Sequence, residues 1–175
     1  MTGADICTRL GRLEAESDIR RLAARYFQIC DNLGPDTPFS ELANLFTPDA
    51  RWEGKGRYQE ALGSYRGREA IVEMIRSYCV PKPHFALTAH FFSSEFLLTN
   101  GDDAHGEWMM LQTSEYADGK ADLRSAAISM EFKRKDLTWR IHSFCTRNLF
   151  SRRTEHWNDT AEIPVPDSIN CGASK

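Results

Sequence analysis

Hydrophobic positions along the first part of the chain recur with the spacing of a helix. From Leu13 to about Asp31, the apolar residues at positions 19, 22, 23, 26, 27 and 30 fall on one face, with arginine and glutamine residues between them. This pattern predicts an amphipathic helix that packs one face on the rest of the protein. Asparagine, glycine and proline cluster at residues 32–36 and break the pattern.

Two more helices are predicted before the middle of the chain. Thr37 followed by Pro38 is typical of a helix start, with threonine as the N-cap and proline at the first helical position. The short helix after them would bury the apolar residues at 39, 42, 43 and 46. Residues 50–58 are predicted to be extended, in a hairpin that ends near Gly63. A third helix over residues 68–79 is stopped by two prolines, Pro81 and Pro83.

The second half of the chain is rich in β-favouring residues. It predicts strands over residues 85–98, 104–116, 123–133 and 138–150, separated by turn sequences at 100–102, 118–120 and 135–137. Helices followed by an antiparallel meander form an α+β order, in which a curved sheet wraps around the helices and leaves a pocket. We therefore expect one domain over residues 1–152 and a polar, proline-bearing tail over residues 153–175.

Composition narrows the possible partners. The hydrophobic content of 41% can fill one core, and the formal net charge of -3 opposes nucleic-acid binding, which requires clustered lysine and arginine. No stretch approaches the roughly 20 apolar residues that span a bilayer, and the first residues lack an apolar signal region. We expect a cytoplasmic protein whose partners include neither nucleic acid nor membrane.

The cysteines and histidines favour no metal site. Five scattered cysteines without a C-x-x-C motif predict free thiols in a reducing compartment. His84 and His90 would share a strand face, but six residues at roughly 3.3 Å each separate them by about 20 Å, too far to ligate one ion. We therefore predict neither a metal nor another cofactor.

Several short motifs occur in a characteristic order. A helical Ile-Arg-Arg-Leu-Ala-Ala-Arg-Tyr run from Ile19 precedes Asp31; Leu-Phe-Thr-Pro-Asp-Ala follows from Leu45, and Tyr-Arg-Gly-Arg-Glu-Ala-Ile from Tyr65. Ala-His-Phe-Phe at 89–92, Gly-Asp-Asp-Ala at 101–104 and Trp-Arg-Ile at 139–141 continue the order. Over residues 10–150 the chain resembles the SnoaL-like and scytalone-dehydratase-like superfamily, which is also called nuclear-transport-factor-2-like. The pattern is most similar to the bile acid 7α-dehydratase and hexachlorocyclohexane dehydrochlorinase branches.

This resemblance implies a cystatin-like α+β barrel, in which a cone-shaped, curved, mixed or antiparallel sheet surrounds the N-terminal helices. In the dehydratase and dehydrochlorinase branches, an acid near the end of the first helix and a histidine in the first meander strand form a catalytic dyad. Asp31 and His90 match those positions, and Tyr26 matches a tyrosine of the bile-acid enzyme. The lyase branches are commonly trimers, so the resemblance also implies a homo-oligomer, a trimer or a dimer.

Each residue of the predicted dyad could instead have a purely structural role. Asp31 lies at the edge of the apolar helix face, where it either enters a pocket or faces solvent. His90 lies among apolar neighbours, where a histidine is often bonded to a core carbonyl. With Asp31 beside it, His90 would instead serve as a general base that the carboxylate orients.

Other candidate residues would bind a substrate. Tyr58 lies near the predicted hairpin, and strand alternation predicts an apolar lining; Thr113 stands where dehydratases carry a histidine or aspartate. His142 and Phe144 would share a face of the last strand, and Phe144 replaces an arginine of the family unless Arg147 or His142 takes over its role. The predicted substrate-binding residues are Trp52, Tyr58, Phe92, Met109, Leu111, Thr113, His142 and Phe144.

We therefore predict a cofactor-independent lyase acting on a hydrophobic, aromatic or polycyclic, hydroxylated small molecule. The reaction would be a dehydration, a related β-elimination, or a retro-aldol step that releases formaldehyde. Two alternatives stay open: an isomerase or cyclase of the ketosteroid-isomerase or polyketide-cyclase type, and a non-catalytic subunit like the dioxygenase β chain.

Overall fold

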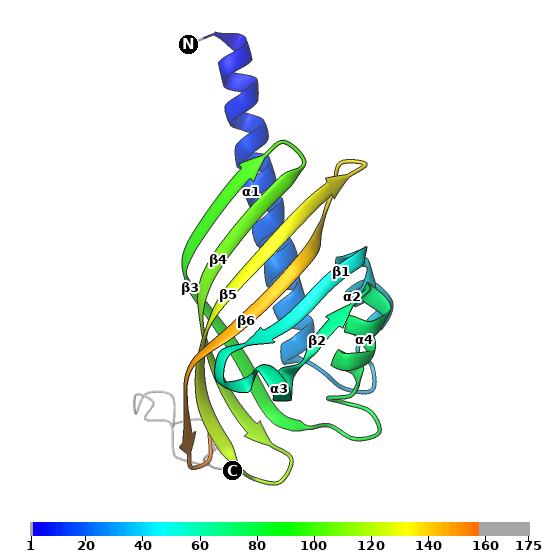
Figure 1. The fold of residues 1–175 in the computed structure, drawn as a ribbon, viewed down its shortest axis with the longest axis vertical. Coiled ribbons are helices and arrows are strands. Elements are labelled where there is room, and N and C mark those ends of the chain that lie inside the picture. The colour runs from blue at the N-terminus through cyan, green and yellow to red at the C-terminus, as the bar shows by residue number, and fades with distance from the viewer. Residues whose placement is uncertain (1, 158–175) are drawn as a thin grey trace, which may run out of the picture.

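A long N-terminal helix forms the spine of the protein. In the computed structural model, which describes residues 2–157, helix α1 runs over Gly3–Asp31. Its start at residue 13 was predicted wrongly. Thr2 caps the helix in a capping box with Asp5, and residues 2–14 are all exposed, so no buried face marks this part of the helix in the sequence. Figure 1 shows these first turns projecting beyond the sheet.

Six strands form one sheet in the order β2-β1-β6-β5-β4-β3. Their bounds are β1 Phe46–Lys55, β2 Ser64–Arg66, β3 Phe85–Asn100, β4 Asp103–Tyr116, β5 Ala121–Lys135 and β6 Thr138–Thr154. The predicted antiparallel meander is confirmed as β3–β6, whereas β1 pairs parallel with β6 and makes the sheet mixed. The sheet curves along α1 and stays open, because β2 and β3 end it on opposite sides (Figure 1). The predicted α+β class is confirmed.

The connection between α1 and the meander differs from the prediction in detail. Helix α2, Phe39–Asn44, has Pro38 rather than Thr37 at its N-cap position. Phe46 is buried as expected, but it begins β1, which carries Pro48 through a register shift next to β6. The hairpin loop contains a 3-10 turn, Gly56–Tyr58, and helix α3, Gln59–Leu62; helix α4, Arg68–Arg76, ends three residues early.

The hydrophobic core lies between α1 and the concave face of the sheet. Ile19, Phe46, Met130, Phe132 and Ile141 are almost fully buried there. Alternation along the strands sets which residues face inward: on β4 the even-numbered positions from Ala104 to Ser114 lie on this face. This parity decides which residues of β4 reach the site.

The chain beyond the sheet is described only in part. Strand β6 continues through Thr154, two residues into the predicted tail, and residues 158–175 of that tail lie outside the described residues. Within residues 2–157, no helix is both long enough and apolar enough to cross a membrane. The four described cysteines are free thiols.

Candidate active site

A cavity of about 490 Å³ opens between the C-terminal half of α1, the concave sheet face and the α3–α4 segment. Its volume is in the range of small-molecule sites. Tyr26, Phe27 and Cys30 line it from the helix, and all four meander strands contribute to its walls. Mostly apolar walls surround a few polar groups, which is typical of a site for a hydrophobic ligand.

The predicted dyad is assembled at this cavity. His90 Nδ1 lies 2.5 Å from Asp31 Oδ1, and the His90 backbone N–H donates to Asp31 Oδ2 over 3.3 Å. Both side chains are shielded from solvent, with 13% of the His90 and 23% of the Asp31 side chain exposed. The acid at the end of α1 and the histidine of β3 therefore contact each other through two hydrogen bonds.

The geometry of the pair assigns the histidine tautomer. Because a carboxylate only accepts hydrogen bonds, a neutral imidazole beside it carries its hydrogen on Nδ1 and keeps a lone pair on Nε2. His90 lines the cavity, and no described residue bonds Nε2. The imidazole is thus held as a base whose free nitrogen is available to a ligand.

Tyr26 provides a hydroxyl in the same cavity. The residue is 4% exposed, and its oxygen accepts a 3.0 Å hydrogen bond from Trp52 Nε1. Burial raises the pKa of Tyr26 well above its ordinary value, and nearby Cys30 raises it further. The phenol therefore stays protonated and can donate to an oxygen of a ligand.

Aromatic residues form the wall next to Tyr26. Phe144 stacks on Trp52 with ring centroids 5.4 Å apart and an interplanar angle of 8°, and both residues line the cavity. Phe144 therefore occupies space where the resemblance implied an arginine. Arg147 does not replace it, because its side chain is exposed on the other face of β6.

Five of the predicted substrate-binding residues do not line the cavity: Phe92, Met109, Leu111, Thr113 and His142. Met109, Leu111 and Thr113 have the wrong strand parity: His90 pairs with Gln112, which places Met110 and Gln112 in the cavity and the odd positions on the outer face. Phe92 packs on Phe27, with ring centroids 4.0 Å apart, and belongs to the core behind the dyad.

His142 is separated from Phe144 by an irregularity in β6. The register between β5 and β6 shifts between Glu131 and Phe132, so His142 is an extra residue in the pairing and does not share the face of Phe144. It contacts Thr47 Oγ1 at 3.0 Å, away from the cavity. Alternation alone predicts the wrong face after such a bulge.

Similarity to known proteins assigns the chain to a family. A family model described as "SnoaL-like domain" matches residues 11–144, which is most of the described chain. The protein belongs to the SnoaL-like family. Among curated proteins, none matches the chain significantly in sequence.

Solved structures share the fold of this SnoaL-like protein. Hexachlorocyclohexane dehydrochlorinase LinA-type3 from Novosphingobium barchaimii LL02 is 20% identical, with a TM-score of 0.69 over 89% of this chain and 99% of that one. A putative scytalone dehydratase from Novosphingobium aromaticivorans is 16% identical, with a TM-score of 0.67 over 86% and 97%. An NTF2-like protein with a cystatin-like fold from the same species is 23% identical, with a TM-score of 0.66 over 85% and 90%.

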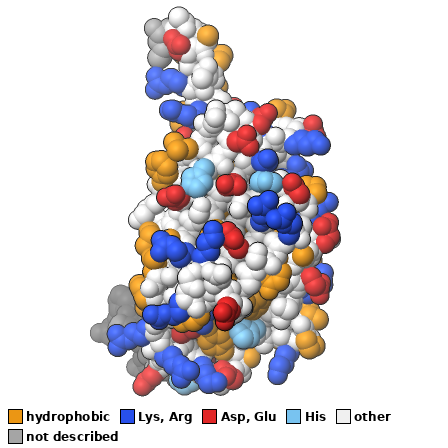
Figure 2. Space-filling view, viewed as in Figure 1, with side chains coloured by type: hydrophobic (Ala, Val, Ile, Leu, Met, Phe, Trp, Pro, Cys, Tyr) orange, Lys and Arg blue, Asp and Glu red, His pale blue; other side chains and the backbone are white. Residues whose placement is uncertain are grey.

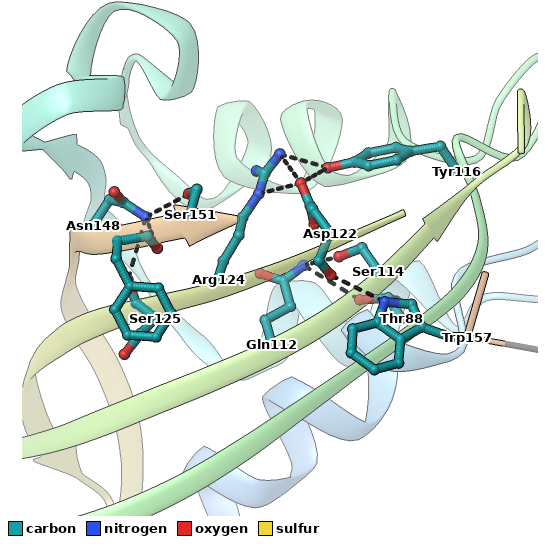
Figure 3. Close-up of polar contacts among 11 residues, drawn as sticks. Thr88, Gln112, Ser114, Tyr116, Asp122, Arg124, Ser125, Asn148, Ser151 and Trp157 are labelled. Carbon is teal, nitrogen blue, oxygen red and sulfur yellow. Dashed lines mark hydrogen bonds and ion pairs between the residues drawn. The ribbon is translucent and has the colours of Figure 1, made fainter. Parts of the chain in front are cut away.

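The SnoaL-like cavity also has a polar end that the sequence analysis missed. Arg124, Tyr116 and Asn148 line the cavity, and Figure 3 shows Arg124 and Tyr116 bonded to Asp122, with Asn148 in a separate group of hydrogen bonds beside Ser151. Arg124 donates to Asp122 Oδ2 from Nε over 2.8 Å, and its Nη2 lies 2.5 Å from the Tyr116 hydroxyl. Strand parity was the available signal, since Arg124 shares its face with the apolar residues 126, 128, 130 and 132 of β5.

Tyr58 is a further residue at the polar end of the cavity. Tyr58 lines the cavity as predicted and lies near Arg124, whose guanidinium carbon is 5.6 Å from the centroid of its ring. A hydrogen bond with Ser151 lowers the pKa of Tyr58, and the nearby Arg124 lowers it further.

Among residues 2–157, no cluster of three or more His, Cys, Asp or Glu side chains could hold a metal ion.

Proposed function

We propose that this SnoaL-like protein is a cofactor-independent lyase in which His90 is the general base. One observation carries the proposal: an imidazole whose Nδ1 is held by a carboxylate lines a largely apolar cavity of about 490 Å³. Family membership, together with the dehydrochlorinase and scytalone-dehydratase neighbours, supports a lyase- or isomerase-type function. Asp31, His90 and Tyr26 would act on a hydrophobic, aromatic or polycyclic, hydroxylated substrate.

The dyad supplies a complete elimination. His90 Nε2 takes a proton from a carbon next to an activating group, and the C–H electrons form the new double bond while the C–O bond breaks. Asp31 stabilises the imidazolium that forms. Tyr26 donates a hydrogen bond to the departing oxygen, which leaves as water after the imidazolium returns the proton.

The same base supports a retro-aldol step. His90 then takes the O–H proton of a hydroxymethyl group, the oxygen forms the C=O bond of formaldehyde, and the C–C bond breaks. The imidazolium returns its proton to the carbon that keeps the electron pair. In an isomerase the proton would return to a different carbon and nothing would leave.

One probe distinguishes these reactions. The ketone 3-hydroxy-1-(2-naphthyl)propan-1-one yields an enone on loss of water and a methyl ketone on loss of formaldehyde. Incubation in D₂O followed by mass spectrometry would show either product for a lyase. Deuterium uptake without loss of a group would favour the isomerase, and an unchanged probe would contradict the proposed substrate class.

An activated probe tests the base itself. We expect the protein to open the ring of 5-nitrobenzisoxazole, which requires only proton abstraction in an apolar site. His90→Ala and Asp31→Asn should each lower the rate by at least roughly 10²-fold. His105 and Glu107 form a matched control pair outside the cavity, with His105 Nε2 3.0 Å from Glu107 Oε1. His105→Ala and Glu107→Gln should not change the rate; near wild-type rates in the dyad variants would overturn the proposal.

We also propose that the chain forms a homo-oligomer through the outer face of β3 and β4. Phe91 pairs with Leu111 across these strands, and Met109 lies two residues further along. These three side chains are 56%, 39% and 39% exposed, and they form an apolar row on the outer face. A second copy of the chain is the partner that we infer for this row.

A further inference from the structure

Two buried hydrogen-bond acceptors at the polar end of the cavity have no partner among the described residues, Asn148 Oδ1 and Asp122 Oδ1, and of these two residues only Asn148 lines the cavity. Its Nδ2 donates to Phe150 O over 3.0 Å, to Ser125 O over 3.2 Å and to Ser151 Oγ over 3.1 Å. Because the two carbonyls only accept, the amide cannot be flipped, and Oδ1 must be the unpaired atom.

A side chain with an unpaired donor lies on the neighbouring strand. Arg124 uses Nε and Nη2 for Asp122 and Tyr116, as Figure 3 shows, while its Nη1 has no partner among the described residues. Asn148 pairs with Ala126 on the neighbouring strand, and Arg124 is two residues from Ala126 on the same face. The two side chains are thus diagonal neighbours, at a spacing that long side chains bridge.

The charge at this end is already compensated. Asp122 Oδ2 lies 2.7 Å from Arg124 Nη2, and the Asp122 side chain is only 10% exposed. A ligand carboxylate would meet a guanidinium that has its counterion, and it would face the Asn148 acceptor without a hydrogen to donate. A neutral hydroxyl both donates and accepts, so it satisfies the two groups together.

The register sets how far this end is from the dyad. His90 pairs with Gln112 on β4, and Gln112 pairs with Arg124 on β5. Two strand spacings separate the His90 and Arg124 backbones, about 10 Å. A molecule with one or two fused rings can extend along this row between the two ends.

We propose that Asn148 and Arg124 bind a neutral hydroxyl group at the end of the ligand opposite its reacting carbon. Asn148 Oδ1 accepts from this hydroxyl, and Arg124 Nη1 donates to its oxygen. That the ligand is a substrate rests on the proposed function, whereas the hydroxyl site itself does not. The substrate class is therefore a ring system that carries a phenolic or alcoholic hydroxyl remote from the bond that breaks.

Three naphthalenes test the site by their affinities. The ligand 2-naphthol both donates and accepts, 2-methoxynaphthalene only accepts, and 2-naphthoate is an anion. Isothermal titration calorimetry or fluorescence should give 2-naphthol a Kd about ten-fold lower than that of the methoxy compound, as one neutral hydrogen bond predicts, and 2-naphthoate the weakest binding. Equal Kd values for the first two would mean that solvent satisfies Asn148, and tighter binding of 2-naphthoate would mean an anion site; either result overturns the proposal.

Variants locate the hydroxyl. Asn148→Leu should raise the Kd of 2-naphthol about ten-fold and remove its advantage over the methoxy compound. The double change Asp122→Asn with Arg124→Met should do the same without leaving a buried charge unpaired. Arg147→Met is the matched control, because Arg147 is exposed on the outer face of the same strand as Asn148.

A dyad variant separates this inference from the proposed function. His90→Ala should keep the preference for 2-naphthol, since the hydroxyl binds at the other end of the cavity. Loss of the preference in His90→Ala but not in Asn148→Leu would place the hydroxyl at the dyad and overturn the inference. The preference can persist even if no lyase activity is found, so the two claims fail separately.

Discussion

At the residue scale, the site depends on side chains whose protonation is set by their surroundings. The Asp31 carboxylate assigns the His90 tautomer, and burial keeps Tyr26 and Cys30 protonated. Both dyad members could be predicted, because each stands in a recognisable motif. Strand parity could have placed Arg124 on the inner face, but its position next to Asn148 depends on a cross-strand register that no local pattern shows.

Cys30 gives the protein a pH-dependent stability. Burial raises the pKa of its thiol from 9.0 to about 12. The folded protein therefore keeps a proton that the unfolded chain releases, so this stabilisation is complete below pH 9 and is lost as the pH rises toward 12. Urea unfolding at several pH values from 8 to about 9.5, below the ordinary tyrosine pKa of about 10, should show a falling free energy of unfolding.

The change Cys30→Ala should make that slope shallower, and the rest of the slope should remain because burial also raises the pKa of Cys79 and Cys145. The variant loses some stability at every pH, because it removes buried volume, but the slope is the relevant measurement. Cys7→Ala is the control, since Cys7 is exposed near the start of α1. An equal slope in wild-type protein and Cys30→Ala would show that the thiol is not the group that titrates.

At the element scale, the long strands were more predictable than the segment before them. Tight turns with glycine or aspartate separate β3–β6, and the antiparallel pairing follows from those turns. The start of β1 was missed because Pro48 indicates a break, although a register shift allows it beside β6. The bulge at His142 was missed for a similar reason: an extra residue in one strand leaves no mark in the alternation until its partner is known.

Gly106 shows how closely β3 and β4 pack on Trp108. A Cβ at this position would lie 2.2 Å from a ring atom of Trp108 and 2.8 Å from Leu97 Cδ2. Since Trp108 is 6% exposed in the core, its ring cannot move aside freely. Gly106→Ala should destabilise the protein by about 1–3 kcal/mol, measured by denaturant unfolding.

Gly11→Ala is the matched control for this change. No atom lies within 4 Å of its new Cβ, and the residue is in the projecting part of α1. Alanine favours the helix, so the variant should be as stable as the wild type or slightly more stable. Equal stability of Gly106→Ala and the wild type would contradict the packing described for β3 and β4.

At the scale of the whole molecule, the fold class and the general location of the cavity follow from the order of helices and strands. The distribution of charge on the surface gives separate information about partners. Figure 2 shows lysine and arginine side chains interspersed with aspartate and glutamate on the viewed face, which does not resemble a phosphate-binding surface. The outer apolar row of Phe91, Met109 and Leu111 could not be distinguished from lining residues by sequence, because alternation gives two faces without saying which is concave.

This row predicts an assembly of identical chains. We expect light scattering coupled to size-exclusion chromatography to give the mass of a trimer or a dimer, and the double change Phe91→Lys with Leu111→Lys to lower that mass. Leu137→Lys is the control, because Leu137 is 88% exposed in the turn between β5 and β6. A monomeric wild-type protein, or an unchanged mass of the double variant, would contradict an interface on this face.

The central claim is that Asp31 holds His90 with a hydrogen on Nδ1 and a free lone pair on Nε2. Nitrogen NMR of protein labelled in its histidine rings, near neutral pH, measures this directly, and comparison with His90→Ala assigns the signals. We predict a protonated Nδ1 and an unprotonated Nε2 for His90, and a loss of this tautomer preference in Asp31→Asn. A hydrogen on Nε2 in the wild type, or an unchanged spectrum in Asp31→Asn, would contradict the account.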